Sequence, residues 1–167
     1  ARTTPASALQ VLYMKSIRVA TLSQVLSACP RLQELGIVRF ADFDATLRLL
    51  HGSTVSKLQL HLPFGYNYAT LCLLTNLTSL TLIRCVGLTD AHVGLIASYN
   101  PTLRALRLTQ CDLVSDVALA NLVSSCAELG TCDVERNLLK PENVDQLIEE
   151  GRIDSTISFL EMGIEVM

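Results

Sequence analysis

The chain has 167 residues, a length at which folding buries about 68–70% of the surface, so one domain is expected. Half of the residues are hydrophobic, only 5% are aromatic, and 31 are leucine. This aliphatic excess excludes a disordered or collagen-like chain. The most apolar stretch, residues 71–82, is interrupted by five Ser, Thr and Asn residues, so no membrane span is predicted.

Charge is distributed unevenly along the sequence. Residues 1–33 have a net charge of +4, residues 128–167 have −7, and the whole chain has −3. Such a gradient can steer a partner, or it can be ordinary solvated surface. With a sequence pI of about 5.6 and no basic stripe interleaved with aromatic residues, nucleic-acid binding is not expected.

Residues that could support catalysis or metal binding do not form a recognisable motif. The six cysteines include no Cys-x-x-Cys pair, and the three histidines add no ligand spacing typical of a metal site. A glycine-rich phosphate loop is also missing, and His61 has no assured nucleophile or carboxylate partner. We therefore expect no enzyme activity, no cofactor, no metal and no small-molecule substrate.

A repeated pattern of apolar residues organises the chain. It begins with Leu-x-x-Leu-x-Met-x-x-Ile at Leu9, and similar units begin near residues 32, 55, 77, 103 and 129, with a degenerate seventh near 154. The fourth and sixth positions of each unit alternate as in a half-buried β-strand. Repeats of this length indicate stacked strand-and-helix units.

A helix is predicted after each strand. In the two clearest units, Thr89 and Ser115 are placed to cap helices, and Asp90 and Asp116 fall in the first turn, where an acid suits the helix dipole. Pro141 suits the first turn of a later helix. Stacked units of this kind predict one α/β domain over residues 1–167. It would be a curved solenoid of about six or seven repeats, with parallel strands on the concave side and helices on the convex side.

The string Leu-x-x-Leu-x-Leu-x-x-Cys, followed by Leu-Thr-Asp or Val-Ser-Asp, resembles the leucine-rich repeat. Residues 77–137 resemble more narrowly its cysteine-containing subfamily, with repeats of about 26 residues, as found in F-box adaptor proteins. Cys85 and Cys111 are then expected to be buried turn residues that donate weakly to backbone carbonyls.

The sequence departs from that subfamily in three places. Eight residues precede Leu9, which leaves no room for an F-box, and the cysteine position holds Phe40 and Pro63 in the second and third units. The first unit also has no polar cap, although terminal repeats normally have one. These features predict a fragment, a processed product, or an N-terminal edge covered by another subunit.

Strand residues that point away from the core are the candidates for partner recognition. Several are apolar where solvated residues would be expected, and arginine is enriched at interaction hot spots. Scattered surface hydrophobics are the alternative interpretation. The selected partner-binding residues are Tyr13, Lys15, Val38, Lys57, His61, Ile83, Arg84, Arg107, Asp133 and Glu135.

Three functions are compatible with these observations. The first is an intracellular module that binds a protein partner through its concave strands, as part of a hetero-complex. The second is a structural subunit of a large assembly, which could be mitochondrial or otherwise organellar because the first 33 residues lack acids and contain Arg, Ser and Thr. The third is the substrate-recognition part of a ubiquitin-ligase adaptor. The sequence does not name the partner.

Overall fold

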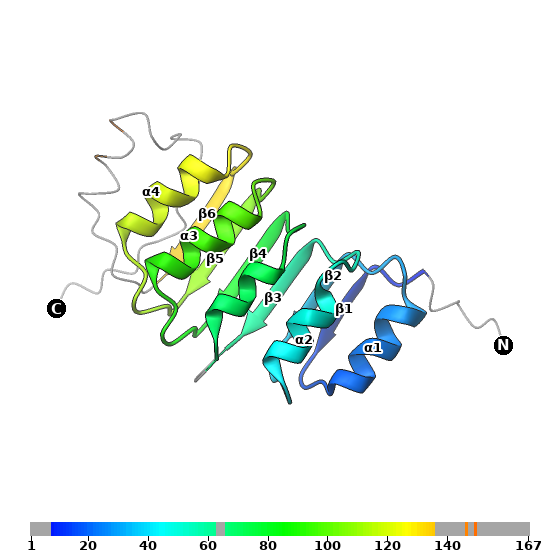
Figure 1. The fold of residues 1–167 in the computed structure, drawn as a ribbon. Coiled ribbons are helices and arrows are strands. Elements are labelled where there is room, and N and C mark those ends of the chain that lie inside the picture. The colour runs from blue at the N-terminus through cyan, green and yellow to red at the C-terminus, as the bar shows by residue number, and fades with distance from the viewer. Residues whose placement is uncertain (1–7, 63–65, 136–145, 147–148, 150–167) are drawn as a thin grey trace.

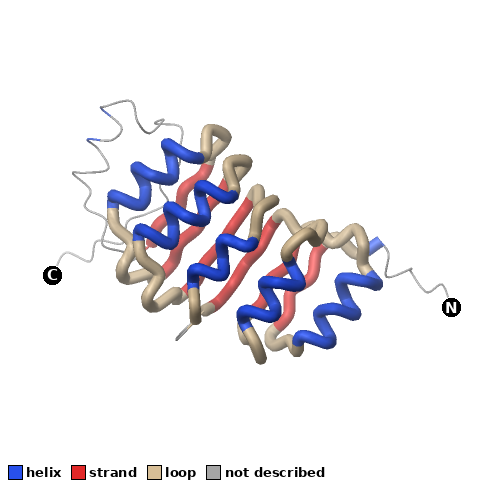
Figure 2. Tube along the Cα trace, in the orientation of Figure 1, coloured by secondary structure: helices blue, strands red, loops and turns tan. Residues whose placement is uncertain are grey.

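The computed structural model describes residues 8–62, 66–135, 146 and 149. These residues form two layers, a six-stranded sheet and a layer of helices on one side of it (Figures 1 and 2). The expected α/β class is confirmed for this part of the chain. The strands are β1 (Val11–Met14), β2 (Glu34–Ile37), β3 (Lys57–His61), β4 (Ser79–Ile83), β5 (Ala105–Thr109) and β6 (Thr131–Glu135).

All neighbouring strands are parallel and follow the order of the sequence. Their register offsets are 23, 23, 22, 26 and 26 residues. The predicted unit starts from Leu9 to Leu129 have the same spacing, so the strand positions and their order are confirmed. The unit expected near residue 154 lies outside the described residues.

The helical layer consists of α1 (Val19–Ala28), α2 (Phe43–Leu50), the 3₁₀ helix η2 (Tyr68–Leu73), α3 (Asp90–Tyr99) and α4 (Asp116–Ser125). Each of these packs against the next helix in the chain. The expectation of similar helices after every strand is wrong between β3 and β4, where η2 replaces an α-helix. That unit spans 22 residues, one fewer than each of the two preceding units, which hold α1 and α2.

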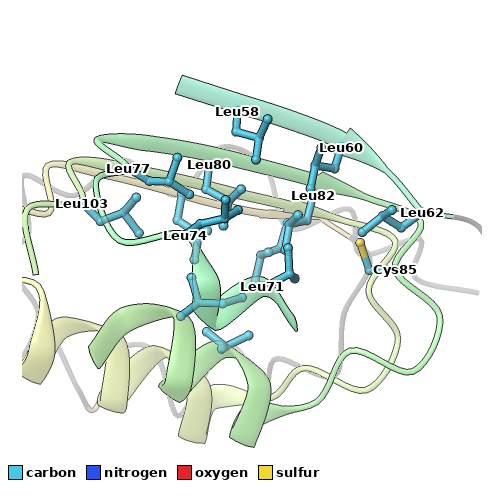
Figure 3. Close-up of a cluster of buried hydrophobic side chains, with 14 of the residues drawn as sticks. Leu58, Leu60, Leu62, Leu71, Leu74, Leu77, Leu80, Leu82, Cys85 and Leu103 are labelled. Carbon is cyan, nitrogen blue, oxygen red and sulfur yellow. The ribbon is translucent and has the colours of Figure 1, made fainter. Parts of the chain in front are cut away.

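The core lies between the two layers. Leu58, Leu60 and Leu80 point from the sheet toward Leu71 and Leu74 beneath it (Figure 3), and each is no more than 4% exposed. Burying one such side chain contributes roughly 1.5–3 kcal/mol. The repeated leucines therefore supply one continuous core rather than separate clusters.

Two predicted helix caps are confirmed. The Ser115 side chain accepts a hydrogen bond from the Val117 amide at 3.3 Å, and Thr89 caps α3 together with the His92 side chain. Asp90 lies in the first turn of α3 and also accepts hydrogen bonds from the Ser115 amide and hydroxyl, at 2.7 and 2.6 Å. The carboxylate of one unit thereby fixes the start of the next. Pro141 lies outside the described residues.

The cysteines behave as structural residues. Cys85 and Cys111 are fully buried, and their thiols approach the Ile83 and Thr109 carbonyl oxygens at 3.8 and 3.7 Å. This confirms the predicted role in the turn. Burial raises the pKa of Cys132 to about 12, with a smaller effect from the neighbouring Asp133 carboxylate.

Asn100 joins two units at the helix–strand junction. Its buried side chain donates to the Leu74 and Ile96 carbonyl oxygens at 2.7 and 2.9 Å and accepts from the Leu77 amide at 3.0 Å. Cys126 occupies the same position 26 residues later, and its thiol contacts the Asn100 carbonyl oxygen at 3.5 Å. The Asn100 side chain thereby satisfies backbone groups of the preceding unit, and the Asn100 carbonyl oxygen accepts from both the Cys126 thiol and the Leu103 amide.

The first unit is less well covered than the others. Leu9 is 39% exposed, whereas Leu32, at the same position of the next unit, is fully buried. Val11 is 47% exposed.

In the described part of the chain, no helix has the length and apolar character needed to cross a bilayer.

Candidate functional site

One face of the sheet carries no helix from the described chain, and we call it the open face. Its residues alternate with the buried leucines along each strand. Aligned by the register, they form a lower row, a middle row and a shorter upper row. The lower row is Val11, Glu34, Lys57, Ser79, Ala105 and Thr131; the middle row is Tyr13, Gly36, Gln59, Thr81, Arg107 and Asp133; the upper row is His61, Ile83, Thr109 and Glu135.

Tyr13 is the most prominent side chain of the open face. It is 58% exposed, and its ring lies over Gly36 on the next strand, where an added β-carbon would overlap it. The hydroxyl donates a hydrogen bond to the Glu34 carboxylate, which raises the pKa of Tyr13 above its ordinary value. Gly36 has no side chain and therefore leaves the space in which the Tyr13 ring lies, and we call this contact the seat of Tyr13.

Arg107 and Asp133 form an ion pair at the other end of the middle row. The Arg107 Nε lies 2.6 Å from the Asp133 carboxylate, and the two side chains are 52% and 11% exposed. The residues face each other in the register of β5 and β6. The arginine side chain is therefore half exposed to solvent, while the aspartate beside it on β6 offsets its charge.

Four other predicted residues also lie on the sheet. Lys57 begins β3 and is exposed, while Ile83 ends β4 and is half-buried. His61 ends β3, and its Nε2 is buried without a hydrogen-bond partner. Glu135 ends β6, and its side chain is outside the described part of the structure.

Three predicted residues lie just beyond the ends of the strands. Lys15 follows β1 and Val38 follows β2, and both are exposed. Arg84 follows β4 with a left-handed backbone, φ 57°, and its Nε donates to the Gln110 Oε1 at 2.8 Å. The strands stop there because the chain bends toward the next helix. These residues form the edge of the open face.

Sequence reasoning placed Glu34 and Gly36 among the outward-facing strand positions, but it did not predict that the Tyr13 ring lies over Gly36. Glu34 and Gly36 are the register neighbours of Val11 and Tyr13. A glycine at an outward strand position next to an aromatic residue is the signal that could have revealed this contact. The repeat spacing already aligned Tyr13 with Gly36.

Other surfaces of the described chain are less suited to chemistry. No group of three His, Cys, Asp or Glu side chains among residues 8–62 and 66–135 could hold a metal ion. A shallow cavity of about 380 Å³ lies on the helical side, between α1 and the loop after α2. Two of its hydroxyls are bonded to the backbone: Ser27 donates to the Ser23 carbonyl oxygen, and Thr54 donates to that of Leu32.

No protein-family model and no curated protein sequence matches this chain. Among solved structures, it is similar to the crystal structure of the leucine-rich repeat-containing protein LegL7 from Legionella pneumophila, with a TM-score of 0.54 and 15% sequence identity. The match covers 80% of this chain and 52% of that one, so this chain spans about half the length of LegL7. At this identity the similarity concerns the fold alone, and the cysteine-containing subfamily stays a prediction. The described chain therefore has the fold of a leucine-rich-repeat protein.

Proposed function

We propose that this chain is a non-catalytic interaction module that binds a protein partner through the open face. The observation that supports this most strongly is the exposure of Tyr13, an aromatic side chain held in place on a face that no described helix covers. Aromatic residues in fixed conformations are favoured at interfaces because little side-chain entropy is lost on binding.

The size of the face defines how the partner binds. The six strands lie about 4.8 Å apart and are four or five residues long, so the sheet has a projected area of roughly 400 Å². A stable interface buries about 800 Å² on each partner. The partner therefore also contacts the edge where the strands end, which includes Lys15, Val38 and Arg84.

The scaffold we propose is a curved solenoid of about six or seven repeats of the cysteine-containing type, with the open face on its concave side. The 26-residue offsets of the last strands and the equivalent turn thiols of Cys85 and Cys111 support this assignment. All six cysteines are free, as is usual inside cells. We propose an intracellular hetero-complex on this basis. Among the described residues, no separate observation favours the assembly-subunit or ubiquitin-ligase-adaptor functions.

A crosslinking experiment in the source cells tests this function. A photo-crosslinking amino acid is placed at Gln59 in the middle of the open face, or at Ser98 on the exposed side of α3. We expect a crosslinked protein from position 59 and little from position 98. The reverse result would place the interface on the helical side and contradict the proposal.

Matched tyrosine variants then test the open face directly. Tyr13→Ala is expected to reduce capture of the crosslinked protein, because it removes the seated ring. Tyr99→Ala on α3, where the tyrosine is 49% exposed, serves as the control and is expected to have no effect. Equal capture by both variants would show that Tyr13 is not part of the interface.

A further inference from the structure

The described chain separates charge along the sheet. Residues 8–62, which contain β1 to β3, carry six Lys and Arg residues against three Asp and Glu residues. Residues 66–135, which contain β4 to β6, carry three against six. The sequence gradient is therefore a gradient across the structure, from a basic end to an acidic end.

The three carboxylates at the basic end are all engaged in local hydrogen bonds. Glu34 accepts from the Tyr13 hydroxyl, Asp42 accepts from the Ala45 amide at 2.9 Å, and Asp44 accepts from the Thr70 hydroxyl at 2.7 Å. The cations of residues 8–62 are all exposed, and none forms an ion pair within the described part of the chain. They are Lys15, Arg18, Arg31, Arg39, Arg48 and Lys57.

At the acidic end, two of the three cations are paired. Arg107 pairs with Asp133, and Arg104 lies 2.8 Å from Glu128. Cations available for a partner are therefore concentrated where the strands β1 to β3 lie.

Two of these cations accompany the exposed apolar residues at one edge of the open face. Lys15 and Arg39 lie just after the ends of β1 and β2, and the Val38 amide donates to the Met14 carbonyl oxygen at 3.1 Å, so the two strand ends are adjacent. Tyr13 and Val38 are 58% and 39% exposed. We call Tyr13, Lys15, Val38 and Arg39 the basic patch.

We propose that the basic patch binds an acidic segment of the partner protein, whose apolar side chain packs against Tyr13 and Val38. This inference rests on the proposed function and adds the chemistry of the partner. We choose an acidic segment because of charge complementarity, since opposite potentials steer association and fix orientation. The mixture of apolar and basic residues suits a peptide better than a nucleic acid, because the described residues form no basic stripe with stacked aromatics.

A displayed library of random peptides of about 12 residues tests the inference with the full chain as bait. We expect the selected peptides to be enriched in Asp and Glu and to contain an apolar residue. The affinity of one selected peptide should fall when NaCl is raised from about 50 to about 300 mM, because salt screens exposed charges. Lys15→Glu with Arg39→Glu should weaken this peptide about tenfold.

The control is Arg31→Glu with Arg48→Glu, which changes the net charge equally but lies before β2 and on α2. It should leave affinity within about twofold. An equal loss of peptide affinity in both double variants would show that only the net charge matters, and it would overturn the inference.

Four further outcomes separate the inference from the proposed function. If the selected peptides are instead neutral or basic and Tyr13→Ala abolishes their binding, this result would refute the acidic partner but would still support binding through the open face. Selection of no peptide would count against both. Self-association that is seen by sedimentation and abolished by Lys15→Glu with Arg39→Glu would identify a second copy as the partner instead. A DNA probe of about 20 nucleotides that binds more tightly than any peptide would identify a nucleic acid instead.

Discussion

Replacing Asn100 by alanine tests how the units are joined. The side chain is fully buried, and it satisfies the Leu77 amide and the Leu74 carbonyl oxygen, which belong to the preceding unit. Asn100→Ala leaves both backbone groups buried without a partner. At about 2 kcal/mol for each orphaned group, the free energy of unfolding should fall by about 4 kcal/mol.

Urea denaturation followed by circular dichroism measures this loss. With a slope near 2 kcal/mol per molar urea, the midpoint should fall by about 2 M. Asn100→Cys should lose about half as much, because a thiol can donate to the Leu74 carbonyl oxygen as Cys126 does to that of Asn100, but it leaves the Leu77 amide unpaired. The control is Asn121→Ala on the exposed side of α4, which should change little. A loss below about 1 kcal/mol for Asn100→Ala would refute this account of the junction.

Three further predictions concern the open face and the core. Gly36→Ala should displace the Tyr13 ring and lower partner binding without reducing the midpoint in urea, since alanine suits a strand better than glycine; an unchanged Tyr13 fluorescence and affinity would contradict the seat. Asp133→Asn should weaken the Arg107 pair and cost about 1 kcal/mol in urea, less in 1 M NaCl than in dilute buffer; equal loss at both salt levels would show that the charge does not matter. Cys132 is held protonated by a pKa raised from 9.0 to about 12, so its contribution to stability should be lost as the pH rises between these values; Cys132→Ala should flatten that part of the pH profile, and an unchanged profile would argue against a buried thiol.

The strand order and register could be predicted from sequence because the core positions repeat. The apolar residue at the fourth position of each unit, leucine in the first five units and Cys132 in the sixth, has to enter the same layer as its neighbour, which sets the register of the parallel strands. Leu35, Leu58 and Leu80 are register partners for this reason. The caps at Thr89 and Ser115 could be predicted because they depend on local chain geometry.

The details of the open face could not be predicted in the same way. The pairing of Arg107 with Asp133 depends on side-chain conformations across two strands, and the seat of Tyr13 depends on a missing side chain at Gly36. The position of Lys15, Val38 and Arg84 beyond the strands depends on where the backbone bends, which apolar periodicity does not specify. The repeat therefore specifies the scaffold, whereas the contacts of the surface residues between the leucines depend on the folded structure.

The sequence also did not indicate the contacts that Asn100 makes. Its place before a proline marks a helix end, but the three backbone groups that it satisfies come from α3 and from the chain between η2 and β4. Only the stacking of one unit on another brings them within reach.

The most direct test of the central claim is the position of the partner crosslink. Crosslinkers at Gln59 and Ser98 sample the open face and the helical side of the same folded chain. The account predicts that one protein is captured from position 59 and that Tyr13→Ala reduces its capture while Tyr99→Ala does not. Capture from position 98 alone, unaffected by Tyr13→Ala, would contradict it.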